Sequence, residues 1–247
     1  MIEKYSHYSN KRYMNNYKIC SGSTLKVIAV VTMIIDHVAG MILVDIPSCN
    51  EAIFSWWGGH LTVVNIMRGI GRWAFPIFAW LLIEGFTHTR NKIRYGLNLL
   101  VFALLSEIPY DLADVGRVGW ECQNIFFTLL LGYIGLLLYD KWTKGVYEKI
   151  LVTIMVACAA LLLRVDYGPF GVIYICLLQL FVTKRLLQCI STVLLLPKGL
   201  VAALAYIPIT LYNGKRGFIC HAWTKYLFYA IYPLHLIFIY WINQEFL

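Results

Sequence analysis

Charged residues are scarce in this sequence: Asp, Glu, Lys and Arg together make up 14% of its 247 residues, whereas hydrophobic residues make up 60%. The mean hydropathy is +0.68. So little charge excludes an ordinary soluble globular domain. The composition instead predicts an all-α fold, a polytopic bundle of transmembrane helices with the lipid bilayer as its main partner.

Two kinds of local pattern are also missing. The seven cysteines show no CxxC or Cys/His spacing, so we expect no metal site. No internal repeat or low-complexity linker divides the chain, which predicts a polar tail at residues 1–24 and one membrane domain at 25–247. Cys49 and Cys122 fall in expected outer loops, where they could form a disulfide or remain two free thiols.

The formal net charge of +8 does not indicate a nucleic-acid partner, because the basic residues cluster in short turns between apolar runs. This distribution is typical of the positive-inside rule for membrane proteins. No secretory signal pattern is visible in residues 1–24, which are polar and basic. We therefore expect a cytoplasmic N-terminus and a multi-pass protein of the plasma membrane.

The charges of successive loops predict about nine spans, with a range of about 8–10. We expect seven of them at residues 25–44, 63–90, 95–110, 124–139, 150–163, 170–182 and 225–243. Two short spans are expected within 186–212, separated at Pro197-Lys198-Gly199, a turn signal that also permits a partly re-entrant hairpin. The C-terminus would then lie outside.

The second span carries Arg68 and Arg72 within its apolar run. A charged side chain at the centre of a spanning helix costs roughly 2.5–3.5 kcal/mol, so both arginines need partners or a watery cavity. Counting residues along the helices places Asp36 of the first span and Glu107 of the third at a similar depth. One interpretation is an ion-pair network that only fastens helices together.

His37 argues for a catalytic site instead, because two arginines and two carboxylates balance without a histidine. An imidazole titrates near neutral pH and can act as a general base. His235 of the last span lies at the same depth and is a second candidate. For His37 as the base, Glu107 or Asp36 would be the orienting group.

Arg72, with or without Arg68, would act as the clamp for an oxyanion or for substrate. Asn124 and Tyr167, at expected outer helix ends, are weaker candidates for contacts to an acceptor. The same buried groups could instead form the proton relay of a coupled transporter. Transporters more often carry paired repeats, which are not visible in this sequence.

The chain resembles the TraX family in seven segments: LKVIAVVTMIIDHVAG, MRGIGRWAFPIFAWLLIEGFTHTRN, LLVFALLSEIPYDLA, NIFFTLLLGYIG, DYGPFGV, LYNGKRG and KYLFYAIYPLHL. The best-known member of that family acetylates the N-terminus of a conjugative pilin. The family also resembles a wider class of membrane acyltransferases that use cytosolic acyl-CoA. That class carries a histidine in its first span, which matches His37, and a basic residue that opens the span, which lies near Lys26.

The resemblance implies transfer of an acetyl or other acyl group from acyl-CoA, with acetyl-CoA as the donor, to an amine or hydroxyl of a peptide, pilin or glycan acceptor. Lys215 and Arg216 lie between glycines in LYNGKRG and, with Lys26 and Arg90, are the basic residues expected to bind the CoA phosphates. The positive-inside rule explains the charges of Lys215 and Arg216 about equally well. A non-catalytic assembly subunit is a third hypothesis for the function, beside the enzyme and the transporter.

Overall fold

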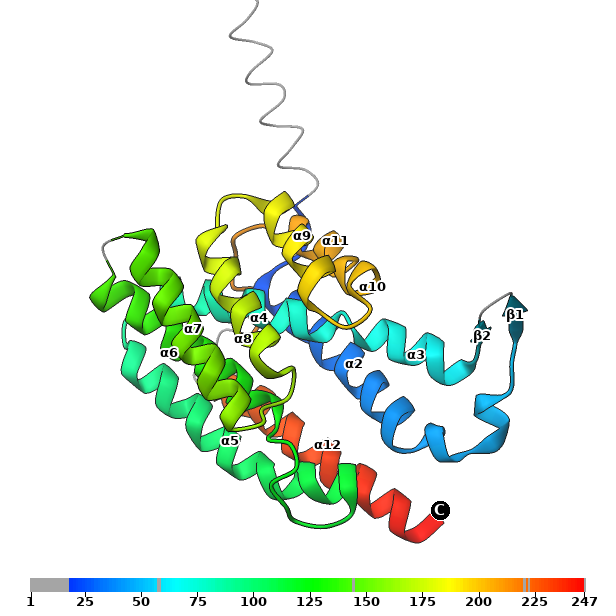
Figure 1. The fold of residues 1–247 in the computed structure, drawn as a ribbon. Helices are drawn as coiled ribbons and strands as arrows, with labels where there is room; N and C mark the ends of the chain where they lie inside the picture. The colour runs from blue at the N-terminus through cyan, green and yellow to red at the C-terminus, as the bar shows by residue number, and fades with distance from the viewer. Residues whose placement is uncertain (1–17, 57–58, 144, 220, 222, 247) are drawn as a thin grey trace, which may run out of the picture.

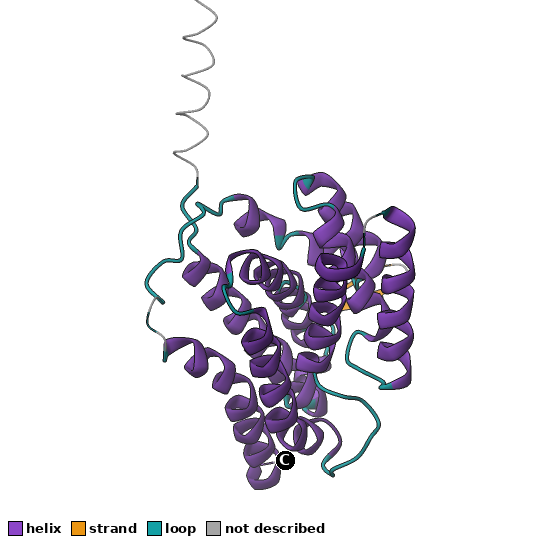
Figure 2. Cartoon of the chain, turned by 90° about the vertical axis from the view of Figure 1, so that its left-hand side faces the viewer, coloured by secondary structure: helices purple, strands orange, loops and turns teal. Residues whose placement is uncertain are grey.

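The computed structural model describes residues 18–56, 59–143, 145–219, 221 and 223–246 (Figure 1). Residues 1–17 of the expected tail lie outside this part of the chain. Most of the described residues are in helices, as the composition predicts (Figure 2). They are α2 (Gly22–Met41), α3 (Val63–Gly71), α4 (Ala74–His88), α5 (Lys92–Val115), α6 (Ile125–Trp142), α7 (Val146–Leu162), α8 (Gly168–Leu180), α9 (Arg185–Leu195), α10 (Gly199–Ala203), α11 (Tyr206–Thr210) and α12 (Thr224–Phe246).

A short β-hairpin follows the first helix. After two 3₁₀ turns, Leu43–Asp45 and Pro47–Asn50, strands β1 (Phe54–Trp56) and β2 (Gly59–Leu61) pair antiparallel. Their register joins Phe54 to Leu61 and Ser55 to His60. The hairpin lies within the expected first outer loop, beyond the last turn of α2 (Figure 1).

Five helical segments of the described chain are long and apolar enough to cross a membrane: residues 22–45, 63–88, 92–115, 125–142 and 226–246. They correspond to the first four expected spans and to the last one. The expected spans at 150–163 and 170–182 appear as α7, with 17 residues, and α8, with 13 residues. The structure therefore supports a multi-spanning helical protein with fewer full-length spans than the nine expected.

The segment expected to hold two spans within 186–212 is a short hairpin instead. At a rise of 1.5 Å per residue, the 11 residues of α9 reach about 16 Å, roughly half of a hydrocarbon core of about 30 Å. The chain turns at Lys198, whose φ of 51° is left-handed, and returns through α10 and α11. A Cβ at Gly199 would lie 2.1 Å from the carbonyl oxygen of Val193, so this turn requires glycine. The turn was predicted correctly, but its arms are too short to span.

The expected second span is broken into α3 and α4 at Arg72 and Trp73. Pro76 explains the position of the break. A proline has no N–H to give to the carbonyl four residues earlier, here that of Arg72, and its ring crowds the same carbonyl. The break therefore places Arg72 at a helix end within the membrane layer.

Helices α2 and α12 run in the same direction. His37 contacts His235, and one turn further Met41 accepts a hydrogen bond of 2.8 Å from the side chain of Asn243. The C-terminus consequently lies at the opposite end of the molecule from α9–α11 (Figure 1). This relative direction agrees with the expected topology, in which the two ends of the membrane domain face opposite sides.

A common apolar core lies between these helices. Its largest buried side chains include Phe75 of α4, Tyr133 of α6 and Tyr174 of α8. Helix α7 packs on α6 and α8 from outside and leaves Leu151 and Leu161 exposed by 67% and 64%. An apolar face of this kind is expected where a helix contacts lipid.

Candidate active site

The imidazole rings of His37 and His235 form a hydrogen bond across α2 and α12. Nδ1 of His37 lies 2.6 Å from Nε2 of His235. The ring planes are within 4° of each other and the centroids are 4.9 Å apart. Because the two nitrogens are much closer than the centroids, the rings meet edge to edge rather than face to face.

The hydrogen bonds of His235 fix the position of the protons. Its Nδ1 lies 2.8 Å from the carbonyl oxygen of Ile231, which can only accept, so this nitrogen donates. The Nε2 of a neutral His235 is then unprotonated and accepts from Nδ1 of His37. Nε2 of His37 is left with its lone pair free. His235 is therefore the group that orients His37, the role that the sequence suggested for Glu107 or Asp36.

Asp36 forms an ion pair with Arg68 instead. One guanidinium nitrogen of Arg68 lies 2.9 Å from Oδ2 of Asp36, and the side chains are 34% and 16% exposed. Gly40, one turn along α2, makes room for this contact, since a Cβ there would lie 2.5 Å from the same guanidinium. The expected neutralisation of Arg68 by a carboxylate of the first span is therefore present.

Arg72 faces a different group of residues. Its guanidinium interacts with the hydroxyl of Tyr167 and with the charge of Asp166, both in the connection between α7 and α8. Asp166 accepts a 2.9 Å hydrogen bond from the backbone N–H of Tyr167, and burial raises the pKa of its carboxyl to about 6. The Tyr167 ring stacks on Phe75, with centroids 4.0 Å apart. Sequence reasoning named Tyr167 for a possible acceptor contact but missed Asp166.

Glu107 lies apart from the histidines and joins α5 to α6. Its Oε2 accepts hydrogen bonds from the backbone N–H and the side-chain amide of Asn124, which is completely buried. The same amide also donates to the carbonyl of Ala103 at 2.8 Å. The side-chain oxygen of Asn124 accepts from the N–H of Phe126. Glu107 and Asn124 therefore hold helices together at the N-terminus of α6.

A small polar cavity, the outer cavity, lies against His37. It has a volume of about 150 Å³. Its lining includes Asp36, His37, Arg68, Arg72, Tyr110, Asp114, Asp166, Tyr167 and Tyr232. Oδ1 of Asp36 and Nε of Arg72 are buried and have no hydrogen-bond partner among the described residues. Buried polar atoms usually find partners, so these two are available to a bound polar group.

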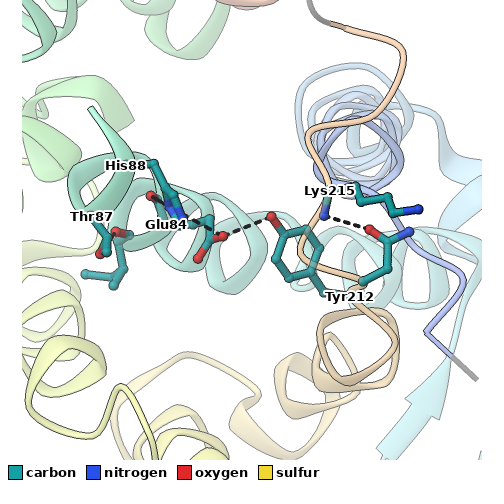
Figure 3. Close-up of polar contacts among 7 residues, drawn as sticks. Glu84, Thr87, His88, Tyr212 and Lys215 are labelled. Carbon is teal, nitrogen blue, oxygen red and sulfur yellow. Dashed lines mark hydrogen bonds and ion pairs between the residues drawn. The ribbon is translucent and has the colours of Figure 1, made fainter. Parts of the chain in front are cut away.

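A larger cavity, the inner cavity, opens at the other end of α2 and has a volume of about 560 Å³. Lys26 of α2, Arg94 of α5 and Arg216 contribute positive charge to its lining. On its rim, Glu84 of α4 accepts a 2.9 Å hydrogen bond from the hydroxyl of Tyr212 (Figure 3). Burial, together with this carboxylate, raises the pKa of Tyr212 to about 12, so the hydroxyl remains a donor.

The loop that carries Lys215 and Arg216 has a structural role that the sequence did not reveal. Their carbonyl oxygens each accept a 2.9 Å hydrogen bond, from the N–H groups of Gly22 and Ser23 at the start of α2. Gly214 and Gly217 adopt positive φ values of 76° and 86° to make this contact. The glycines therefore allow the loop to dock on the start of α2.

The basic residues predicted to bind CoA separate into two groups. Lys26 and Arg216 line the inner cavity. Lys215 is exposed and extends away from Glu84 and Tyr212 (Figure 3), and Arg90 is exposed beyond the end of α4. Arg94, which was not proposed for the site, lines the cavity instead.

The two cysteines considered for a disulfide do not pair. Cys49 and Cys122 are both free thiols, so the disulfide considered for them is not formed. The Cys122 thiol interacts with the Tyr110 hydroxyl, with 3.7 Å between sulfur and oxygen. Over the residues that the structure describes, no group of three or more His, Cys, Asp and Glu side chains is placed to hold a metal ion.

The fold and the site define a polytopic helical membrane protein with a buried, histidine-containing polar site. The chain belongs to the TraX family: residues 21–243 match the family described as TraX protein. It is similar to a protein of Dichelobacter nodosus named "Probable fimbrial assembly protein FimC, serogroup H1", with 26% identity over 245 residues, covering 87% of this chain and 93% of that protein. No solved structure matches the chain significantly.

Proposed function

We propose that this protein is an integral-membrane acyltransferase that moves an acetyl group from acetyl-CoA to an amine or hydroxyl of an acceptor. The observation that carries the proposal is the hydrogen-bonded pair of His37 and His235, which leaves Nε2 of His37 unprotonated beside the outer cavity. A positioned imidazole with a free lone pair is what a general base requires.

The reaction needs a proton acceptor and a stabilising group for the oxyanion. The acceptor N–H or O–H transfers its proton to Nε2 of His37 as the nucleophile attacks the acyl carbonyl carbon. His235 holds the His37 ring and stabilises the imidazolium through the hydrogen bond at Nδ1. When the carbon–sulfur bond breaks, the thiolate of CoA takes up the proton. Arg72 lines the outer cavity, and its positive charge would stabilise the oxyanion.

The inner cavity supports the assignment of the donor. CoA carries several phosphates, and Lys26, Arg94 and Arg216 place positive charge around a cavity at the end of the molecule expected to face the cytoplasm. We propose that this cavity binds the nucleotide part of acetyl-CoA. Lys215 and Arg90 would contribute only long-range attraction.

The relative's printed name bears on the acceptor. The relative is named for fimbrial assembly, which favours a peptide acceptor such as a pilin over a glycan for this protein. The plasma membrane, with the N-terminus in the cytoplasm, is the proposed location because donor and acceptor would then reach the site from opposite ends.

The same name also favours a second candidate, a non-catalytic subunit of fibre assembly. The two are separated by one assay. Purified protein in lipid nanodiscs is mixed with acetyl-CoA carrying a labelled acetyl group, and with either a peptide that has a free amino terminus or a monosaccharide. An enzyme releases free CoA thiol and labels the acceptor. A non-catalytic subunit gives neither product, and that result would reject the acyltransferase.

A further inference from the structure

A third cavity, the middle cavity, lies between the inner and outer cavities. It has a volume of about 120 Å³. It shares Lys26, Leu81 and Tyr229 with the lining of the inner cavity. It shares Met33, Phe78, Ile125 and Tyr232 with the lining of the outer cavity. The three cavities therefore follow one another along the bundle.

One face of α2 passes all three cavities. Lys26, Val30, Met33 and His37 are spaced by four, three and four residues, which places them on the same side of a helix. Lys26 and His37 are separated by eleven positions, which correspond to about 16 Å along the helix axis. A ligand that extends along this face would connect the basic inner cavity with the histidine pair.

The middle cavity differs chemically from its neighbours. Apart from Lys26 and the two tyrosines, its lining is apolar and includes Val30, Leu99 and Leu129. This apolar lining suits an uncharged chain and not a phosphate group. The pantetheine arm of CoA has twelve bonds from phosphate oxygen to sulfur and, at the advance of an extended peptide, spans roughly 14 Å. This length is close to the separation of Lys26 and His37.

Tyr232 stands where the middle and outer cavities meet. It is 4% exposed, and its hydroxyl has no hydrogen-bond partner in the described part of the chain. The backbone N–H of Ile125, the first residue of α6, lies near the hydroxyl oxygen without reaching hydrogen-bond geometry. The Tyr232 ring contacts both His37 and His235 edge-on, with centroids 5.9 and 5.6 Å away. A buried hydroxyl with a free proton is therefore held beside the base.

We propose that the middle cavity holds the pantetheine arm of the acyl-CoA donor, and that the Tyr232 hydroxyl donates a hydrogen bond to the acyl carbonyl oxygen as it becomes an oxyanion. This inference rests on the proposed acyltransferase function. In the transfer, the carbon–sulfur bond breaks, the acyl carbon bonds to the acceptor, and His37 carries the proton from acceptor to thiolate. Tyr232 keeps its own proton and adds a neutral donor to the positive charge of Arg72, at the point where the middle and outer cavities meet.

Two matched pairs of variants test the proposal in nanodiscs with acetyl-CoA and the peptide acceptor. Tyr232→Phe removes only the hydroxyl, and Tyr139→Phe is its control because the Tyr139 hydroxyl is hydrogen-bonded to Thr153 between α6 and α7 and lines none of the three cavities. Val30→Phe fills the middle cavity, and Val31→Phe is its control because Val31 is 49% exposed and does not line that cavity. Binding of adenosine 3′,5′-bisphosphate reports on the inner cavity separately.

The proposal predicts that Tyr232→Phe lowers kcat by about 10²–10³-fold with little change in KM, the usual effect of losing one oxyanion donor. Val30→Phe should abolish transfer but still bind the bisphosphate, and both controls should resemble the wild type. A wild type that transfers acetyl while Tyr232→Phe remains equally active overturns this inference alone. Equal activity of a folded Val30→Phe would show that the middle cavity holds something else, such as a lipid tail. A wild type that does not transfer at all rejects the inference together with the proposed function.

Discussion

Gly71 of α3 packs directly on Asp36 of α2, so closely that a Cβ at position 71 would lie 2.3 Å from the Cβ and Oδ1 of Asp36. This contact allows the two helices to bring Arg68, Asp36 and His37 to one side of the outer cavity. The approach of α3 to α2 is therefore part of how the site is built.

Replacing Gly71 by alanine should separate the two helices. The added methyl group has no space, and overpacking of this kind typically costs about 1–3 kcal/mol. We expect a lower thermal midpoint in detergent and a weaker Asp36–Arg68 contact. Gly69→Ala is the matched control, because its Cβ would meet only Val201 at 3.8 Å. Similar thermal midpoints for the two variants would contradict the close packing of Gly71.

The ion pair of Asp36 and Arg68 should be measurable by a double-mutant cycle. Both side chains are partly exposed, so we expect a coupling energy of about 0.5–3 kcal/mol, below the roughly 3–5 kcal/mol for breaking a fully buried pair. The free energy of unfolding of Asp36→Ala, Arg68→Ala and the double variant provides the cycle. Additive effects would show that the two residues are near each other without stabilising each other.

His235 should act as a positioning residue for His37. His235→Ala removes the acceptor that holds Nδ1 of His37, and we expect kcat to fall by about 10²-fold with KM nearly unchanged. His235→Gln can place an amide oxygen near the former Nε2 and should restore part of the rate. A purely structural role would not produce this rescue, so equal rates for the alanine and glutamine variants would argue against the positioning role.

Arg216 and Lys215 are neighbours in the sequence with different expected effects. Arg216 lines the inner cavity and Lys215 extends away from its rim. Losing a charge-assisted hydrogen bond to phosphate costs about 1.5–3 kcal/mol of binding free energy. Arg216→Gln should therefore weaken acetyl-CoA binding by roughly 10- to 100-fold. Lys215→Gln should change it little. Equal effects in an equilibrium binding assay would mean that only the net charge of the loop matters.

The polar layer could be predicted from the sequence because ionisable residues inside apolar runs are visible without a structure. Asp36, His37, Arg68, Arg72 and His235 do lie near one another, as depth along their helices suggested. Depth does not give the rotation of each helix. The sequence separation of 198 between His37 and His235 left their pairing open, and Glu107 proved to face Asn124.

Other features could not be predicted by counting residues. Asp166 and Tyr167 lie in the connection between α7 and α8, whose sequence predicts an ordinary exposed loop. Their position near Arg72 is visible only in the structure. In the sequence, Tyr232 is one of several aromatic residues in an apolar helix, and nothing distinguishes it from the others. The break at Arg72 was visible in principle, because Pro76 lies four residues later.

Acetyl transfer by His37→Ala, compared with His60→Ala, decides whether His37 is the general base. His60 lies in β2, where it hydrogen-bonds Ser55 away from both cavities, so its variant controls for the loss of an imidazole. With labelled acetyl-CoA and the peptide acceptor, we expect His37→Ala to fold normally and to lose about 10²–10⁴-fold in kcat, while His60→Ala keeps the wild-type rate. A folded His37→Ala protein with the wild-type rate would contradict His37 as the general base.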